Sequence, residues 1–220
     1  MKSLIRLGFL LAATLWLALA APSRPLAAQP VGRAAAEFPN LKPNRQETPW
    51  GRLVADALQS AGKADCALIN AGALRAGTLE AGSVESDDIA ALLSFGDDEA
   101  VTLSLSGAQL RAALERGAST YPTGSPAFLH VAGLSASFDT SAPSGQRISG
   151  VRVAGRPLDD KATYSVAMPV SLSEGAAGYF NIWNGAKARP AGQNLLSAVG
   201  GYFKNRGEVS PDNAARFGPR

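Results

Sequence analysis

A short apolar strand that ends in a polar turn constrains the fold of this chain more than any other feature. The apolar residues Cys66 to Ile69 lead directly into Asn70, and Gly72 and Arg75 follow in the turn. Glycine lets the backbone turn tightly and approach a ligand closely, while asparagine and arginine offer hydrogen bonds that suit phosphate or carboxylate groups. Because open α/β sheets usually bind ligands at strand ends, we expect a ligand site here. The alternative is a surface turn with a solvated arginine.

The start of the chain has the features of a secretory signal in residues 1–20. Lys2 and Arg6 give it a positive beginning, an apolar run follows, and Ala18-Leu19-Ala20 is a small-residue cleavage motif. We therefore expect a periplasmic or secreted protein. The apolar run is short for a membrane span and no later stretch approaches its length, so we expect no membrane attachment once the signal is cleaved.

Composition and charge limit the classes of protein that this chain can belong to. With 220 residues, 46% of them hydrophobic, it can bury one domain-sized core. The formal charge of +3 includes Lys2 and Arg6, so their removal leaves about +1, which argues against a nucleic-acid partner. Cys66 is the single cysteine, so no internal disulfide can form, and its apolar strand favours a buried, inert thiol.

The chain divides by composition into a folded domain with a segment on either side. Residues 21–43 are rich in proline, alanine and arginine and lack periodicity, which predicts a flexible leader. Residues 44–206 hold the patterned segments and form the expected domain. Residues 207–220 are polar, and we expect them to be a frayed tail.

Helix caps and alternating strands within the domain predict a mixed α+β fold. Thr48 and Pro49 predict the start of a helix that Gly62 ends. Ser106 and Gln109 form a capping box for another helix. Further expected elements are strands over 101–105, 128–138, 148–153 and 164–170, the last two flanking a hairpin-like turn, and a helix over 194–204.

Adjacent acids at Asp87 and Asp88 allow two interpretations. They could serve acid/base or metal chemistry. Ser86 before them favours a helix cap, with the two acids complementing the positive end of a helix over 87–93. Farther along, the acids Asp97 to Glu99 are most simply a solvated loop, although their position beside Phe95 places them at the border of a site.

Catalytic motifs are missing from the sequence. His130, the one histidine, lies in an expected strand, and a structural role suits it better than metal ligation. A two-metal centre needs several histidine and carboxylate ligands, and neither a phosphate-binding glycine loop nor a Ser/His/Asp signature is present. We therefore expect no catalytic residue, no metal and no cofactor in this chain.

Five segments in the same order resemble the 5'-nucleotidase C-terminal domain family. Asn70-Ala71-Gly72-Ala73-Leu74-Arg75 resembles the family's Asn-Gly-Gly-Gly-Ile-Arg. The other segments are Trp50–Ala57, Leu93–Gly96, Leu105–Leu110 and Phe128–Gly133. This domain is the substrate-recognition half of a two-domain family that includes periplasmic UDP-sugar hydrolases. The resemblance implies an α+β fold with a mixed β-sheet packed with helices, standing alone without the metallophosphatase domain.

The resemblance also implies ligand-binding roles for residues of the opening turn and for Phe95. In the family the asparagine of the turn contacts the base and the arginine serves the phosphate or sugar, which points to Asn70 and Arg75, with Gly72 between them. Phe95 matches an aromatic that stacks on the base; the alternative for Phe95 is a core aromatic, with equal weight.

Departures from the family pattern affect the same site. A second arginine, a second stacking aromatic and an acid that binds the ribose fall on Asn44, Ser171 and Ala177. Half the base clamp and the ribose contact are therefore missing, unless Tyr179 or Phe180 substitutes for the aromatic.

Two functions from different classes follow from the resemblance. The first is an exported nucleotide-recognition module of nucleotide catabolism, bound to a nucleotide or related phosphorylated molecule and working with a separate metallophosphatase. The alternative is a degenerate domain that acts as a protein-interaction scaffold without nucleotide binding. The family is a hydrolase family, but its metals are held by a domain that this sequence lacks, so residual hydrolysis by this chain ranks last.

Overall fold

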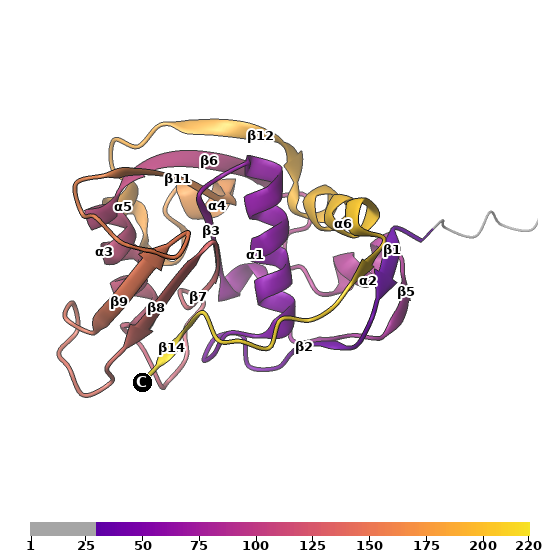
Figure 1. The fold of residues 1–220 in the computed structure, drawn as a ribbon, viewed down its shortest axis with the longest axis horizontal. Coiled ribbons are helices and arrows are strands. Elements are labelled where there is room, and N and C mark those ends of the chain that lie inside the picture. Colours follow the sequence, from indigo (N-terminus) through magenta and orange to yellow (C-terminus); the bar gives the residue numbers. More distant parts are fainter. Residues whose placement is uncertain (1–29) are drawn as a thin grey trace, which may run out of the picture.

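The computed structural model describes residues 30–220, and its centre is a five-stranded mixed sheet with helices on both faces (Figure 1). Strands β3 and β11 are parallel, and the other neighbours are antiparallel. The order across the sheet is β12 (Ala188–Asn194), β6 (Glu99–Ser106), β11 (Thr163–Pro169), β3 (Cys66–Asn70) and β7 (Leu129–Ala132). The expected signal in residues 1–20 and the first part of the expected leader lie outside the described residues.

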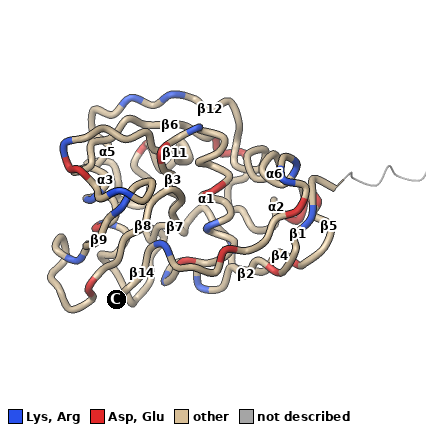
Figure 2. The backbone as a smooth tube through the Cα atoms, viewed as in Figure 1, with Lys and Arg blue, Asp and Glu red and all other residues tan. Residues whose placement is uncertain are grey.

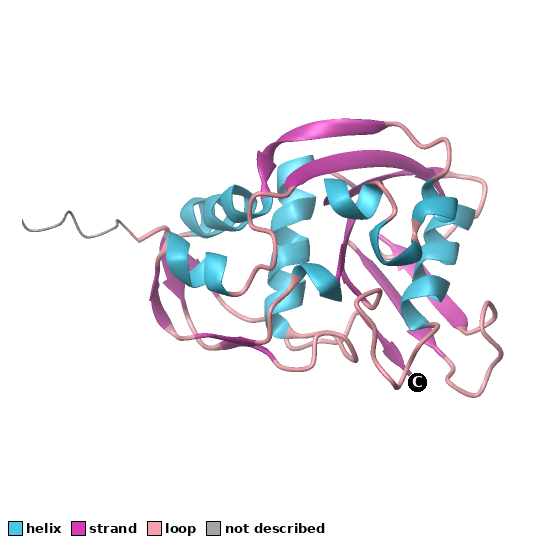
Figure 3. Ribbon diagram, turned by 180° about the vertical axis from the view of Figure 1, so that it is seen from behind, coloured by secondary structure: helices cyan, strands magenta, loops and turns pink. Residues whose placement is uncertain are grey.

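Strand alternation divides the core into two layers. Ala67 and Ile69 of β3 pack in the layer with α1 (Pro49–Gly62) and α6 (Leu195–Arg206). Cys66 and Leu68 point to the opposite layer. That layer holds α3 (Gly107–Ala118) and two short helices, α4 (Val170–Ser173) and α5 (Phe180–Trp183), and the view from behind shows helices over this face too (Figure 3). The α+β expectation is confirmed.

Helix α1 begins as the sequence predicts but ends for a different reason. The Thr48 side chain accepts a hydrogen bond from the Gly51 N–H at 3.0 Å, and Pro49 occupies the first turn. Gly62 still lies in the helix, and Lys63 takes the left-handed conformation after it, with φ 47°. A Cβ on Gly62 would lie 2.7 Å from Thr102 Oγ1 and 2.8 Å from Ala167 Cβ. Gly62 therefore permits close packing of α1 on the sheet.

The two other predicted caps have different outcomes. The capping box of Ser106 and Gln109 is confirmed at the start of α3. The short helix α2 covers Ser86–Ala91, and its N-cap is Glu85, in a capping box with Asp88. The assignment of Ser86 as the cap was therefore wrong by one residue. Asp87 and Asp88 do lie in the first turn of α2, where they complement the helix dipole.

A second sheet covers one end of the domain. Its order is β10 (Arg156–Pro157), β9 (Ile148–Val153), β8 (Leu134–Phe138) and β14 (Phe217–Pro219). The strand expected over 128–138 is in fact β7 and β8, divided at Gly133, whose φ of 67° suits glycine. The β9 hairpin partner is β10, and β11 pairs with β6 and β3.

Both flanking segments are part of the fold, so the flexible leader and frayed tail were wrong for the described residues. A three-stranded sheet joins β13 (Glu208–Val209), β1 (Gly32–Ala34) and β5 (Gly82–Val84). A two-stranded sheet joins β2 (Phe38–Asn40) to β4 (Gly77–Leu79). Phe38, Phe203 and Phe217 are buried, which explains why residues near both ends are ordered.

Buried charges hold the C-terminal segment against α1. Glu47 accepts hydrogen bonds from the backbone N–H groups of Val131, Arg216 and Phe217 at 3.2, 2.6 and 2.8 Å. Arg216 donates to both carboxylate oxygens of Asp56 at 2.6 and 3.0 Å. Burial raises the pKa of Glu47, and the backbone donors act against that rise.

Charged residues of both signs are interspersed along the described chain (Figure 2). Within that part of the chain, none of the helices combines the length and the apolar character that crossing a membrane requires.

Candidate functional site

Asn70 ends strand β3 and leads into a short 3-10 turn, η1 (Ala71–Ala73). Its side chain is only 6% exposed, and its Nδ2 donates a hydrogen bond to the Pro126 carbonyl at 3.1 Å. The Oδ1 atom is buried and has no hydrogen-bond partner among the described residues. A buried acceptor without a partner is energetically costly and uncommon. Asn70 therefore places an unsatisfied hydrogen-bond acceptor at the end of β3.

Gly72 lies in the turn because a larger residue would not fit. Its φ is outside the left-handed region, so the conformational freedom expected from the sequence is not what this position requires. An added Cβ would lie 3.0 Å from Asn70 Nδ2 and 3.1 Å from Pro126 Cβ. Glycine therefore leaves room for the Asn70 amide and Pro126, and the expected close approach to a ligand stays a prediction.

A short antiparallel pairing connects the turn to Phe95. Leu74 and Leu93 form a bridge, and the Ser94 N–H donates to the Ala73 carbonyl at 2.9 Å. On the other side of the bridge, the Arg75 N–H donates to the Leu92 carbonyl at 3.0 Å. The segment from Leu92 to Ser94 thus runs beside the segment from Ala73 to Arg75, while Gly72 lies in the 3-10 turn and bonds to the Pro126 carbonyl instead.

Arg75 has a fixed backbone and an exposed side chain. Asn40 Nδ2 donates to its carbonyl at 2.5 Å, and Trp50 Nε1 donates to the neighbouring Leu92 carbonyl at 3.3 Å. No ion pair involves Arg75 within residues 30–220. Its guanidinium is available for an anion.

Phe95 lies on the surface, with 57% of its area exposed, so the alternative of a core aromatic is wrong. It lines an open hollow of about 400 Å³. The other lining residues are Asp97, Asp98, Glu99, Val170 and Ser171. Asn70, Gly72 and Arg75 do not line this hollow, so of the four predicted ligand-binding residues only Phe95 lies there.

The loop that carries Phe95 is held at several points. The N–H groups of Leu195 and Leu196, at the start of α6, donate to the carbonyls of Asp98 and Gly96 at 2.9 Å each. The Asp98 N–H donates to the Phe95 carbonyl at 3.2 Å. The exposure of the Phe95 ring is therefore a property of an anchored loop.

Ser171 and Ala177, where the sequence departs from the family pattern, are both tied to neighbours. The Ser171 hydroxyl donates to Asp98 Oδ2 at 2.5 Å, and its N–H donates to Asp98 Oδ1 at 3.3 Å. Arg116 donates twice to the Ala177 carbonyl, at 3.1 and 2.6 Å. Ser171 lines the same hollow as Phe95, without an aromatic ring to contribute.

The two aromatics proposed as substitutes, Tyr179 and Phe180, differ in burial. Tyr179 is fully buried, stacks on Trp183 with ring centroids 5.4 Å apart, and donates its hydroxyl to the Ala127 carbonyl at 2.7 Å. Burial raises the pKa of Tyr179. A ring anchored in this way is not free to enter the hollow, whereas Phe180 is 68% exposed.

Asn44, the remaining departure, lies beside a loop that also contacts Asn70. The Asn44 carbonyl accepts from the Ser125 N–H at 2.9 Å, and the next residue, Pro126, is the acceptor for Asn70 Nδ2. Asn44 is thus near the turn, with an amide where a second guanidinium was expected.

His130 and Cys66 are both buried in the core of the domain. His130 is fully buried; its Nδ1 accepts the Thr48 N–H at 3.3 Å, so the ring is the tautomer that donates Nε2–H to the Pro43 carbonyl at 3.0 Å. Burial lowers the pKa of His130 to about 4, and burial raises the pKa of the Cys66 thiol to about 12. Within residues 30–220, no group of three or more histidine, cysteine or acidic side chains could hold a metal.

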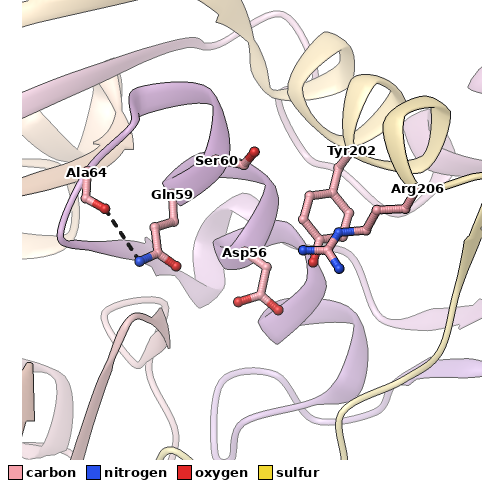
Figure 4. A pocket seen from close by; sticks show the side chains of 6 residues that line it. All are labelled: Asp56, Gln59, Ser60, Ala64, Tyr202 and Arg206. Atoms are coloured by element: carbon pink, nitrogen blue, oxygen red, sulfur yellow. Dashed lines mark hydrogen bonds between the residues drawn. The ribbon is translucent and has the colours of Figure 1, made fainter. Parts of the chain in front are cut away.

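A second hollow of about 410 Å³ lies between α1 and α6 (Figure 4). Its lining residues are Asp56, Gln59, Ser60, Ala64, Tyr202 and Arg206. The Arg206 guanidinium lies 4.4 Å over the Tyr202 ring, and Asp56 is already paired with Arg216. Its polar groups contact one another, and it is separate from the Phe95 hollow.

The acids of the Phe95 loop also line the hollow. Asp97, Asp98 and Glu99 were expected in a solvated loop that could border a site; Asp97 and Glu99 are exposed, and all three line the hollow. Their position directly after Phe95 was the available signal.

The structure is an α+β domain in which a mixed sheet has helices on both faces and its strand β3 ends in a polar turn. Residues 30–183 match the family described as 5'-nucleotidase, C-terminal domain. The chain belongs to this family.

Individual relatives agree with that assignment. The chain is 28% identical over 139 residues to the snake venom 5'-nucleotidase of Naja atra, and 29% identical over 209 residues to a 5'-nucleotidase-related protein of Glossina morsitans morsitans. These alignments cover 60% and 85% of this chain but 26% and 37% of the relatives. The chain therefore spans between about a quarter and two fifths of these relatives.

Solved structures share the fold. A 5'-nucleotidase precursor from Thermus thermophilus superimposes with a TM-score of 0.81 at 26% identity, covering 87% of this chain and 39% of that one. The NAD nucleotidase of Haemophilus influenzae has a TM-score of 0.76 at 21% identity, covering 89% of this chain and 39% of that one, which supports the fold alone.

Proposed function

We propose that this chain recognises a nucleotide, or a related phosphorylated small molecule, in nucleotide catabolism. The observation that carries the proposal is the exposed ring of Phe95, held on an anchored loop at a hollow of about 400 Å³. Exposing a large aromatic ring to water is unfavourable, and one anchored in this position is suited to stacking on a planar base.

Three residues of the strand-end turn, outside the hollow that Phe95 lines, complete the proposed site. Asn70 supplies a hydrogen-bond acceptor for the ligand, since its Oδ1 lacks a partner in the described chain. Gly72 keeps the turn free of a side chain that would displace that amide. Arg75 is exposed and serves the phosphate or sugar.

Catalysis is assigned to a metallophosphatase outside this sequence, and the chain is assigned to the periplasm or the extracellular space. The first assignment is supported by the absence of a metal-holding cluster within residues 30–220. The second is supported by the signal-like residues 1–20 and by relatives named as venom 5'-nucleotidases.

Calorimetric titration of the purified chain with AMP, UMP and UDP-glucose tests the proposal. We expect binding in the millimolar range, because one stacking face and one charged contact are missing. Phe95→Leu keeps an apolar side chain but removes the ring, and should weaken binding about 5-fold or more. Leu41→Ala, at another exposed apolar residue, should leave affinity unchanged. No heat at millimolar ligand would reject the proposal.

A second candidate function is a protein-interaction scaffold that does not bind nucleotides. It is favoured by the lining of the hollow, where Ser171 stands in place of a second aromatic and Phe95 is the one aromatic among the lining residues. A pull-down from periplasmic extract with the parent chain and Arg75→Ala distinguishes the two. Retention of the same partner by Arg75→Ala, together with no nucleotide binding by the parent, would favour the scaffold.

A further inference from the structure

Three of the six residues that line the Phe95 hollow are acidic. Asp97, Asp98 and Glu99 line it, and no lysine or arginine is among its lining residues. Asp97 and Glu99 are exposed and form no ion pair within residues 30–220. Asp98 is bound to Ser171 through both carboxylate oxygens.

We propose that this hollow selects nucleotides whose base carries a positive charge, and that it keeps phosphate out. The inference rests on the proposed function, because it concerns the charge preference of the same site. The hollow and the exposed Phe95 define the site, and the acids determine which rings it favours.

Two physical effects act in the same direction on a cationic ring. The face of Phe95 carries a negative electrostatic potential that attracts a cation placed over it. Carboxylates within a few ångströms of a partly desolvated cation add Coulomb attraction, and they repel a phosphate by the same amount per charge. A neutral ring gains only stacking.

The backbone that carries the acids of the hollow is anchored. Backbone hydrogen bonds from Leu195 and Leu196 hold the loop that carries the acids, so binding needs little reorganisation. The cation on the adjacent strand, Arg189 of β12, pairs opposite Thr102 and not opposite Glu99. Three residues of β6 separate those positions, a distance of about 10 Å.

The position of Arg75 fits this division of charge. The Arg75 N–H donates to the carbonyl of Leu92, three residues before Phe95 in the chain, and the Arg75 side chain is exposed. Three residues span at most about 10 Å, which limits the distance between the Leu92 and Phe95 backbone positions. A nucleotide can therefore place its ring over Phe95 and direct its phosphate toward the exposed guanidinium, away from the acids.

A matched pair of ligands tests the inference: GMP and 7-methyl-GMP, whose ring is cationic at mildly acidic pH. Calorimetric titration of the full chain should show 7-methyl-GMP binding roughly 5-fold more tightly. In the double variant Asp97→Asn, Glu99→Gln the preference should fall to about twofold or less, since only Phe95 and the Ser171-bound Asp98 remain to favour the cation. The control double variant, Glu37→Gln with Glu80→Gln, removes the same charge from exposed acids elsewhere and should keep the preference.

The possible outcomes distinguish a failure of this inference from a failure of the proposed function. Equal binding of the two ligands, or a preference that the Asp97/Glu99 variant retains in full, would overturn the charge selectivity while leaving nucleotide recognition intact. Binding of neither ligand would overturn both. A preference lost in the Asp97/Glu99 variant and kept in the control supports the inference.

Discussion

Restoring the missing aromatic at Ser171 should strengthen nucleotide binding. Ser171 lines the same hollow as Phe95, so a Ser171→Phe side chain would offer a second stacking face. Stacking one base on an aromatic contributes about 1–3 kcal/mol, which corresponds to roughly 5- to 150-fold in affinity. The lost hydrogen bond to Asp98 lowers folding stability by about 1 kcal/mol, a change the folded domain can tolerate.

The assay is calorimetric titration with AMP, with Ser171→Ala as the matched control. The alanine variant loses the same hydroxyl without gaining a ring, so it isolates the stacking contribution. We expect Ser171→Phe to bind at least 5-fold more tightly than Ser171→Ala, near the lower limit for one stacked base. A folded Ser171→Phe variant with the affinity of Ser171→Ala would refute the reasoning that Phe95 and Ser171 face one ligand.

Three predictions concern the scaffold that positions the site. His130 has a pKa of about 4 when folded and 6.5 when unfolded, so its neutrality stabilises the fold fully above pH 6.5 and that stability is lost as the pH falls toward 4. Urea unfolding should lose up to about 2 kcal/mol between pH 6.5 and 5, with the raised pKa of Glu47 opposing part of the fall; stability that rises instead would contradict this. Arg216→Met leaves Asp56 without its bidentate partner and should lower urea stability by about 2 kcal/mol, against less than about 0.5 kcal/mol for the exposed control Arg45→Met; equal values would show that the network contributes little. Gly51→Ala places a methyl group against the His130 ring and should destabilise the fold by about 3 kcal/mol in thermal unfolding followed by circular dichroism; an unchanged midpoint would disprove that contact.

Local signals in the sequence predicted several elements well because their causes lie within a few residues. The Thr48 cap and the box of Ser106 and Gln109 are formed by neighbouring groups, so their chemistry is visible in the sequence. Ser86 was misassigned because Glu85, beside it, can cap the same helix with Asp88 as its partner.

Long-range contacts explain what the sequence could not reveal. The ends of the domain resemble a polar leader and tail, but Phe38 and Phe217 are buried in the core. Glu47 contacts the backbone at Arg216, far away in the sequence, and no local pattern encodes that contact. Gly62 is likewise needed because α1 packs closely against the sheet at this position, and this contact is visible only in the folded chain.

The candidate site was predictable in part. The polar turn identified Asn70, Gly72 and Arg75, and the resemblance added Phe95, but exposure could not be deduced from the sequence. The structure places Phe95 on a hollow and leaves Asn70 with an unpaired acceptor. That Asp97 and Glu99 line this hollow is apparent from the folded chain.

The most direct test of nucleotide recognition is an NMR titration of the isotopically labelled chain with AMP. We predict shift changes at the Asn70 side-chain amide, the Gly72 backbone amide and the Phe95 ring, with the signals around Tyr202 and Arg206 in the hollow of Figure 4 unchanged. Shift changes confined to that other hollow, or none at millimolar AMP, would contradict recognition at the strand-end turn.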